Sequence, residues 1–462
     1  MQQPRLKAIT KPIFTVLGCT AVLAAAQDAP PTAPAAPVAS NPLFDLGAGQ
    51  EVPPTPLLPD PQPIPDAPPP PAFIGPEKNP VPKKEARPDR KWKVIPFAGF
   101  EVSWTDNLFA SATRRRSDFF SIISPGLAAG WGDYGGEIRH LGSYGQHFEP
   151  LDLEPDNLPK NFTFGRYNLN ATFFARNSDQ NVVNHDAMIA GRWEGGKLTL
   201  GTRFYLQTLS DLDIEVGGRV NRTVYGGEIT SNYSLTGKTS LELNLYNRSY
   251  DYSRQLSWQE WMVEDWVDYQ IRPKTKLSFG TRLGIVGVQS SPTQTFEQLV
   301  GRVAYAANAK LGFSLDGGVE WRQFGAGGGD EVFGVFNLSA TYTPFDGTLL
   351  SVNAHRRNSP SVVLSGDNII ATGVSALVRQ RFQQRYLFTV EGGYENSVYQ
   401  SRIAGAGRGR EDNTTYIRSG VSFDVTRKLS VEAAFQHRRN DSSLADLSFT
   451  ENVFIVQFKL RL

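Results

Sequence analysis

Apolar side chains recur at every second position over most of this chain, from Trp92 to Leu462. A period of two is that of a β-strand, whose successive side chains point to opposite faces. The last strand is the clearest case, with Phe454, Val456, Phe458, Leu460 and Leu462 on one face and Gln457, Lys459 and Arg461 on the other. One face therefore requires apolar surroundings, and the other tolerates water.

Short turn signals separate the strands at regular intervals. They lie at residues 132–135, 195–197, 236–238, 273–275, 308–310, 346–347, 383–384 and 426–428, and from the second onward they are about 35 to 43 residues apart. Longer polar stretches, such as residues 325–330 and 401–413, lie midway between them. Alternation of short turns with long loops is typical of transmembrane β-barrels, with the short turns on the periplasmic side.

The number of turns predicts the number of strands. If both termini lie in the periplasm, eight turns require eighteen antiparallel strands. The first interval is too long, because it holds strand-like pieces at residues 136–148 and 162–176 before the strand that ends at Trp193. One large loop would account for it, or an extra hairpin that makes twenty strands. We favour eighteen, so residues 92–462 are predicted to form an all-β fold, a single closed antiparallel transmembrane barrel.

Composition excludes other classes of protein. Beyond residue 26 no run of about 18 apolar residues occurs, so a helical membrane protein is excluded. Lys plus Arg is 47 and Asp plus Glu is 46, which leaves no overall field to attract nucleic acid. A soluble sandwich or propeller is the competing all-β fold, and it predicts a protein that is stable without detergent.

Residues 1–26 are predicted to be a secretory signal peptide. Arg5, Lys7 and Lys11 precede an apolar stretch at residues 13–24, and the alanines at 24–26 form a cleavage site. The apolar stretch is too short to span a bilayer stably, which argues against an uncleaved anchor. Processing as a lipoprotein at Cys19, the only cysteine in the chain, stays open as an alternative.

Residues 27–91 are predicted to be a disordered Pro-rich tether in the periplasm. Twenty of the 31 prolines lie here, and proline supports neither helices nor sheet ladders. An extended spacer is the simpler interpretation, and a docking segment for a periplasmic partner is the alternative.

Two sets of residues follow from the alternation. The predicted lumen-lining set is Arg203, Glu242, Arg282, Asp316, Glu320, Arg322, Arg379, Arg381, Glu391, Lys459 and Arg461. The predicted lipid-facing set is Leu200, Phe204, Leu243, Leu315, Leu338, Phe454, Val456, Phe458, Leu460 and Leu462. Eighteen strands leave room for an aqueous channel. The mixed lumen charges define no ion preference, and Glu242→Arg is expected to change that preference while sparing folding.

Several short motifs occur in a recognisable order. They are Trp104-Thr105-Asp106-Asn107-Leu108-Phe109, Asp118-Phe119-Phe120, Ser124-Pro125-Gly126-Leu127, His185-Asp186 with Gly191-Arg192-Trp193, Glu297-Gln298-Leu299, Trp321-Arg322-Gln323-Phe324, Pro344-Phe345-Asp346-Gly347-Thr348 and Gly393-Tyr394-Glu395-Asn396. In this order the chain resembles the putative β-barrel porin 2 family, with residues 140–165 as an insertion. The resemblance implies an outer-membrane barrel that conducts polysaccharide or small solutes, and members of the family occur with exopolysaccharide-synthesis operons.

No chemical site is evident. The five histidines show no metal-ligand spacing, and no nucleotide-binding or hydrolase motif occurs. We therefore predict no enzyme activity, no cofactor, no metal and no nucleic-acid partner. The predicted function is an outer-membrane channel, with a plugged assembly or adhesion platform as the alternative. Expected partners are outer-membrane lipid and lipopolysaccharide, for which Arg114–Arg116 are candidate contacts, the barrel-insertion machinery and polysaccharide-export components.

Overall fold

The computed structural model describes residues 92–132, 161–308, 310–325, 329–383, 385–400, 409–426 and 428–461. The predicted signal peptide at 1–26 and the predicted tether at 27–91 lie outside the described residues, as does most of the proposed insertion at 140–165. All described residues belong to one compact unit, Leu43–Leu462.

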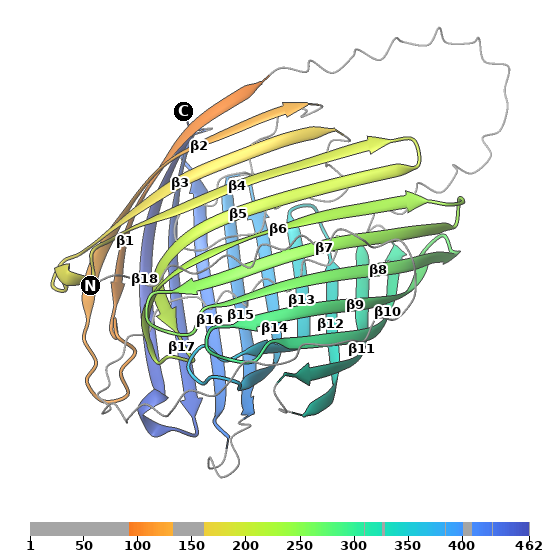
Figure 1. Cartoon of the computed structure of the whole chain (residues 1–462). Helices are drawn as coiled ribbons and strands as arrows, with labels where there is room; N and C mark the ends of the chain where they lie inside the picture. The colour runs from red at the N-terminus through yellow and green to blue at the C-terminus, as the bar shows by residue number, and fades with distance from the viewer. Residues whose placement is uncertain are drawn as a thin grey trace, which may run out of the picture. The chain divides into compact units, whose positions relative to one another are not determined.

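The described residues form eighteen antiparallel strands in a single sheet that closes on itself (Figure 1). The strands are β1 Lys93–Thr105, β2 Asp118–Gly132, β3 Phe162–Phe174, β4 Val182–Gly195, β5 Leu198–Asp213, β6 Gly218–Ser234, β7 Thr239–Tyr252, β8 Trp258–Arg272, β9 Thr275–Val288, β10 Gln294–Asn308, β11 Leu311–Phe324, β12 Asp330–Tyr342, β13 Thr348–Pro360, β14 Asn368–Phe382, β15 Tyr386–Gln400, β16 Glu411–Asp424, β17 Leu429–Ser442 and β18 Phe449–Arg461. The predicted eighteen-stranded barrel is confirmed.

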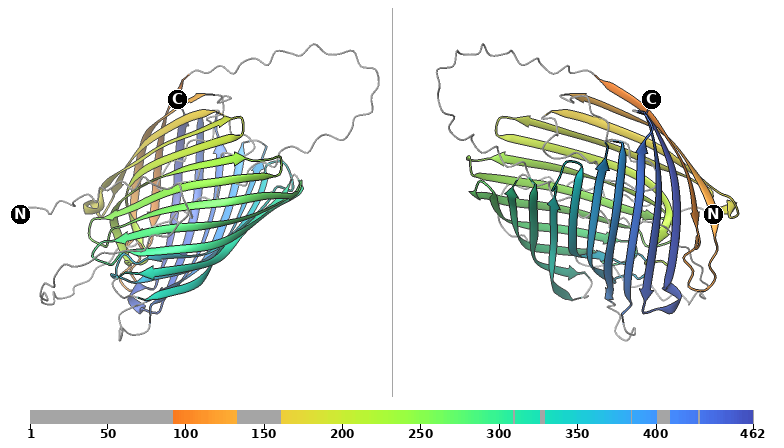
Figure 2. Two further views of the ribbon diagram at one scale, coloured as in Figure 1. Left: turned by 45° about the vertical axis from the view of Figure 1, so that its right-hand side comes forward. Right: turned by 180° about the vertical axis from the view of Figure 1, so that it is seen from behind.

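The first and last strands close the ring. β1 pairs with β2 on one side and with β18 on the other, where Phe100 lies opposite Phe458. Figure 2 shows β1 and β18 side by side. Pairing of Phe97–Thr105 with β18 closes the ring at this joint, and a closed ring is what a strand array inside hydrocarbon requires.

Short turns gather at one end of the barrel. The seven predicted turns from 195–197 to 426–428 each join consecutive strands, beginning with β4 to β5 and ending with β16 to β17. Gly196 and Gly347 take positive φ angles of 60° and 78° in two of them, a conformation that glycine adopts without strain. The eighth predicted turn opens the connection from β2 to β3, of which residues 133–160 are not described.

Two 3-10 turns, Ser178–Gln180 and Ala445–Leu447, lie between β3 and β4 and between β17 and β18. Within the described part of the chain, no helix is long and apolar enough to cross a membrane.

The two faces of each strand differ as the alternation predicts. On β8, Glu264 and Trp266 face inward and are buried, whereas Val263 and Val267 face outward and are exposed. The residues predicted to face lipid that lie on the outward face are Leu200, Phe204, Leu243, Leu315, Leu338, Phe454, Val456, Phe458 and Leu460. Leu462 lies outside the described residues. Contact of this face with lipid stays a prediction.

Among the described strands, the joint between β12 and β13 has the fewest paired residues. β12 and β13 pair only from Tyr342↔Leu350 to Phe336↔Arg356. Beyond that point, residues 330–335 keep their pairing with β11, and residues 357–360 keep theirs with β14. The two strands therefore separate over the half of the wall that lies farther from the short turns, and we call this opening the seam.

Candidate functional site

The inner wall formed by β7 to β11 carries a dense network of charges. Arg302 on β10 lies at its centre, where its Nη1 donates to Glu242 Oε2 at 3.2 Å. Its guanidinium also lies 3.9 Å from the ring centroid of Trp266, a cation–π contact. Glu242 is 3% exposed and also pairs with Lys276 at 3.5 Å.

This environment corrects the expectation for Glu242→Arg. A third cation beside Arg302 and Lys276, with no carboxylate at that position, would be a buried and unpaired charge, which is strongly destabilising. The substitution is therefore expected to impair folding rather than to change ion preference alone.

A second group of contacts continues the network around the barrel. Arg282 on β9 donates from Nε to Glu264 Oε2 at 2.5 Å and from Nη2 to Asp316 Oδ2 at 3.1 Å. The indole Nε1 of Trp266 donates to Glu264 Oε1 at 2.6 Å. Because each charge has an opposite charge beside it, the wall presents alternating signs and no net field of one sign.

The network ends on β10 and β11 near the long loops. Arg322 Nε donates to Glu320 Oε1 at 2.7 Å, and its Nη1 donates to Gln294 Oε1 at 3.0 Å. Gln294 in turn exchanges hydrogen bonds of 2.9 and 3.1 Å with Asn368. Asn368 begins β14, which is not a neighbour of β10 in the wall, so the start of β14 must reach across the interior.

The opposite inner wall is less crowded. Lys459 pairs with Glu432 at 2.8 Å, and Glu391 accepts a hydrogen bond from Tyr416 at 2.9 Å. Near the short turns, Arg381 and Asp424 lie 3.4 Å apart with side chains 38% and 46% exposed. These pairs are more exposed than those on β7 to β11, but Arg438 and Glu451, 2.8 Å apart on β17 and β18, form a buried pair on this wall as well.

All eleven predicted lumen residues lie on the inward face. They are Arg203, Glu242, Arg282, Asp316, Glu320 and Arg322, together with Arg379, Arg381, Glu391, Lys459 and Arg461. The structure brings Arg282 together with Asp316 and brings Glu320 together with Arg322. Arg203 instead pairs with Glu228 at 3.1 Å. Whether the set lines a water-filled path stays a prediction.

The tip of the β5–β6 hairpin crosses the end of the barrel that carries the long loops. Leu212 and Ile214 pack with Ala110 of the β1–β2 loop and with Phe449 at the start of β18. All four side chains are at most 4% exposed. Since β5 and β6 belong to a different part of the wall from β1 and β18, this contact can form only over the mouth.

Glu215, at the same tip, binds the β13–β14 loop on the far side. Its carboxylate accepts hydrogen bonds from Ser361 Oγ and from the backbone N–H groups of Val362 and Val363. Arg410 Nη2 donates to the carbonyl oxygen of Ile214 at 2.8 Å. Burial, reinforced by the negative charge of Asp213, raises the pKa of Glu215 to about 7.

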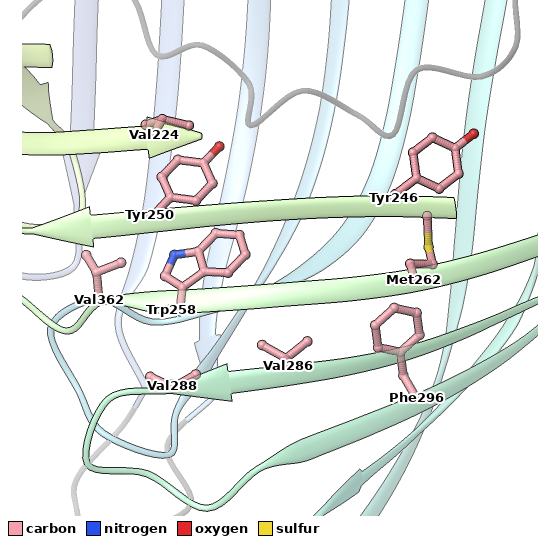
Figure 3. Packing of buried hydrophobic residues seen from close by; sticks show 9 residues of the cluster. All are labelled: Val224, Tyr246, Tyr250, Trp258, Met262, Val286, Val288, Phe296 and Val362. Carbon is pink, nitrogen blue, oxygen red and sulfur yellow. The ribbon is translucent and has the colours of Figure 1, made fainter. Parts of the chain in front are cut away.

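Val362 completes the closure from the β13–β14 side. It packs against inward apolar side chains of β6 to β10, among them Trp258 and Val288 (Figure 3). Its carbonyl oxygen accepts a hydrogen bond of 2.9 Å from the Leu256 backbone in the β7–β8 loop. The β5–β6 tip and the β13–β14 loop therefore form one strap across the mouth, which we call the mouth strap (residues 212–217 and 361–367).

Sequence reasoning did not identify the mouth strap. Its members come from loops about 150 residues apart, as Glu215 and Val362 show, and a periodic pattern says nothing about contacts between loops. One signal was present: the apolar run Val362-Val363-Leu364 lies in a loop, where polar residues are expected.

Three of the five histidines, His185, His355 and His437, lie in the part of the chain that the structure describes. Among the described residues, no group of three or more His, Cys, Asp or Glu side chains could bind a metal ion. His185 faces outward and contacts the hydroxyl of Tyr167 at 2.8 Å, while the adjacent Asp186 pairs with Arg166 on the inner face. His355 contacts Glu395 at 3.1 Å. His140 and His147 lie outside the described residues.

Comparison with solved structures finds bacterial proteins at low sequence identity. Similar structures include Pseudomonas aeruginosa OpdK with vanillate (8% identity, TM-score 0.41), covering 80% of this chain and 99% of that chain. Acinetobacter baumannii OccAB3 (11%, 0.42) covers 80% and 99%, and Pseudomonas aeruginosa OccK2, also named OpdF, (10%, 0.43) covers 80% and 98%. No curated protein matches the sequence.

Comparison with family models gives the more specific result. The model described as Putative beta-barrel porin 2 matches residues 300–462, which run from β10 to the end of the chain. This is the family that the sequence motifs resemble. The match confirms the resemblance over residues 300–462, and the protein is an eighteen-stranded β-barrel whose C-terminal region is similar to the putative β-barrel porin 2 family.

Proposed function

We propose that this protein is an outer-membrane channel for small polar solutes, and that the mouth strap closes it in the conformation described here. The observation that carries the proposal is the closed ring of strands with an apolar outward face and a charged inward face. A soluble barrel would have the reverse arrangement, since its interior would form the hydrophobic core.

The outward face supports placement in a membrane. Large apolar side chains such as Leu243, Phe279 and Phe454 are more than half exposed on it. Trp92 and Trp193 are also exposed, near the end that carries the short turns, where an aromatic girdle would meet the membrane interface. Such an apolar surface would not persist in water, which favours the outer membrane of a Gram-negative cell as the site of action.

Small solutes fit the interior better than a polymer does. Exopolysaccharide conduction is implied by the family resemblance, but a polymer chain would need the whole mouth strap to leave the mouth. A small solute could pass if only one of the two segments of the mouth strap, 212–217 or 361–367, moved aside. Interaction with polysaccharide-export components remains a proposal that the resemblance alone supports.

Planar-bilayer recording tests the channel. We expect low or intermittent conductance for the native protein and a larger, steadier conductance for Glu215→Ala combined with Arg410→Ala, because these substitutions remove the contacts between the strap and the β13–β14 and β15–β16 loops. Asp441→Ala, a substitution in an exposed Arg439–Asp441 pair near the loops, is the matched control. Its conductance should equal that of the native protein.

A plugged assembly or adhesion platform is the second candidate, and the closed mouth is the observation that favours it. This function predicts no conductance for either the native protein or the double variant. Both proteins must first show heat-modifiable mobility on gels, which establishes that the barrel is folded. Absence of conductance from folded double variant would reject the channel in favour of the platform.

A further inference from the structure

A recess lies in the inner wall beside the seam. The described residues that line it come from β7 to β13 and include Arg322, Asn337, His355, Arg356, Arg357 and Asn358. Val335 and Phe336 also line it, at the point where the pairing of β12 with β13 ends. The recess therefore lies next to the seam. Met262 and Phe296, which also line it, belong to the apolar cluster that contains Val362 of the mouth strap.

Positive charge exceeds negative charge in this recess. Five arginines and three carboxylates are among its lining residues. Three of the arginines pair with the three carboxylates: Arg248 with Glu260, Arg282 with Asp316, and Arg322 with Glu320. Arg357 shares Glu395, which lies outside the recess, with His355. Arg356 donates to the hydroxyl of Thr372 at 2.9 Å, which is a neutral partner.

Buried polar atoms in the recess have no protein partner. Asn358 is 6% exposed, yet neither its Oδ1 nor its Nδ2 forms a hydrogen bond. The Nε and Nη1 atoms of the adjacent Arg357 are also buried without a partner. An amide and a guanidinium left unsatisfied in this way each cost free energy, and a bound ligand would remove that cost.

We propose that this recess binds a molecule bearing a carboxylate or a phosphate, which enters from the side through the seam. Arg356 and Asn358 share one face of β13. The guanidinium of Arg356 holds the oxyanion, and Asn358 pairs with a neighbouring hydroxyl or ester group of the same molecule. The site goes beyond the channel function, because it requires neither conduction nor an open mouth.

The chemistry of the side chains selects this ligand. A guanidinium presents paired N–H donors that match the oxygens of a carboxylate or phosphate. The Asn358 amide offers one donor and one acceptor, which suits a hydroxyl or an ester beside the anion. A cation would meet the excess of arginines and is disfavoured. The same group occurs in a free sugar acid and in the headgroup of an anionic lipid.

Binding measurements with two probes distinguish these sources. The full chain is folded in detergent, and gluconate binding is followed by equilibrium dialysis. In parallel the protein is placed in phosphatidylcholine nanodiscs that contain phosphatidylglycerol, and retained lipid is counted by native mass spectrometry. Binding of gluconate identifies a free solute, and selective retention of phosphatidylglycerol identifies a lipid headgroup. If neither probe binds, the proposal is overturned.

Variants locate whatever binding is seen. Arg356→Gln should weaken binding about ten-fold, the effect of losing one hydrogen bond to a charged group, and Asn358→Ala should weaken it about five-fold, the effect of losing a hydrogen bond between neutral groups. Arg385→Gln, which removes the same charge in the β14–β15 turn, should leave binding unchanged. Heat-modifiable gel mobility verifies that each variant is folded. Equal weakening by all three variants would show that binding is nonspecific and would refute the site.

A pair of cysteine variants tests the seam without any ligand. In a Cys19→Ser background, Ala340→Cys with Val352→Cys places two thiols at directly paired positions, where a disulfide can form. Phe333→Cys with Ser359→Cys occupies the positions that would pair if the seam were closed. We expect rapid oxidation of the first pair and persistent thiols in the second. Equally rapid oxidation of both pairs would show a continuous wall and contradict the side entrance.

Discussion

The two halves of the inner wall use the same residue types in opposite ways. On β7 to β11, Glu264, Asp316 and Arg322 are at most 2% exposed, and each forms an ion pair with a side chain of opposite charge. Near the short turns of β14 to β16, the Arg381–Asp424 pair remains more than a third exposed, although Arg438 and Glu451 on β17 and β18 form a buried pair nearer the mouth. Both halves alternate with an apolar outward face, so strand patterning does not cause the difference.

The cause is the material packed inside the barrel. The β13–β14 loop lies against β6 to β10 through Val362, and β14 reaches β10 through Asn368. The charges of β7 to β11 are covered by this material and must satisfy one another, whereas those of β14 to β18 near the short turns can be hydrated. We therefore expect a water path along the inner face of β14 to β18 near the short turns, while β7 to β11 form a structural wall.

The largest effect is expected from removing one carboxylate in the covered half. Glu264→Ala leaves Arg282 and Arg302 beside an empty position, and breaking a buried pair from one side costs about 3–5 kcal/mol. Glu391→Ala in the hydrated half should cost about 1 kcal/mol or less, the value of one ordinary hydrogen bond. Urea unfolding in lipid vesicles measures both, and equal losses would contradict the comparison.

The outward face should tolerate charge equally poorly in both halves. Leu243→Arg, 56% exposed on β7, is expected to cost about 2–4 kcal/mol if it lies near the bilayer midplane. Leu235→Arg, in the β6–β7 turn, should cost about 1 kcal/mol or less, because it lies near the interface. The same unfolding assay checks this pair. If Leu243→Arg lowers the free energy of unfolding by less than about 1 kcal/mol, this face does not contact hydrocarbon.

Closure of the mouth should depend on pH through Glu215. Its pKa is about 7 in the closed strap and near 4.5 when hydrated, so the closed state holds the proton more tightly. The closed state is therefore most stable below pH 4.5, and it loses stability as the pH rises to about 7, by about 3 kcal/mol at most. Conductance recorded between pH 5 and pH 8 should increase with pH.

Glu215→Gln is the control for this titration. The amide can still accept a hydrogen bond from the Val362 backbone, but it carries no charge at any pH, so conductance should stay low throughout. The remaining charges around the tip, Asp213 and Arg410, are unchanged in this variant. A pH response that survives the substitution would assign the titration to another group.

The smallest effect is expected where both charges meet water. Asp424→Ala removes the exposed partner of Arg381, and such pairs contribute about 0–1 kcal/mol. Unfolding should barely change, whereas the ratio of anion to cation permeability should rise, because a positive charge is left beside the proposed water path. Reversal-potential measurements in a salt gradient check this. An unchanged ratio would place the path elsewhere.

The sequence predicts the wall well because the wall obeys a local rule. Alternation and turns predict the eighteen strands that the structure has, and they place Arg203 on the opposite face from Leu243 and Phe454, as the strand pairing does. Contact of these faces with water and lipid stays a prediction. The alternation did not predict the contacts of Glu215 and Val362 or the seam, because these depend on how loops distant in sequence meet over the mouth. Burial of individual pairs, such as Arg282–Asp316, was also inaccessible, since it depends on what fills the interior.

Labelling of single cysteines along β16 tests the central claim most directly. In a Cys19→Ser background, substitutions at the inward positions Arg418 and Ser422 should react with a membrane-impermeant maleimide in vesicles, and substitutions at the outward positions Ile417 and Val421 should not. The expected result is strict alternation of labelled and unlabelled positions. Equal labelling of both faces, or a protein that stays monodisperse without lipid or detergent, would contradict a barrel that spans the membrane.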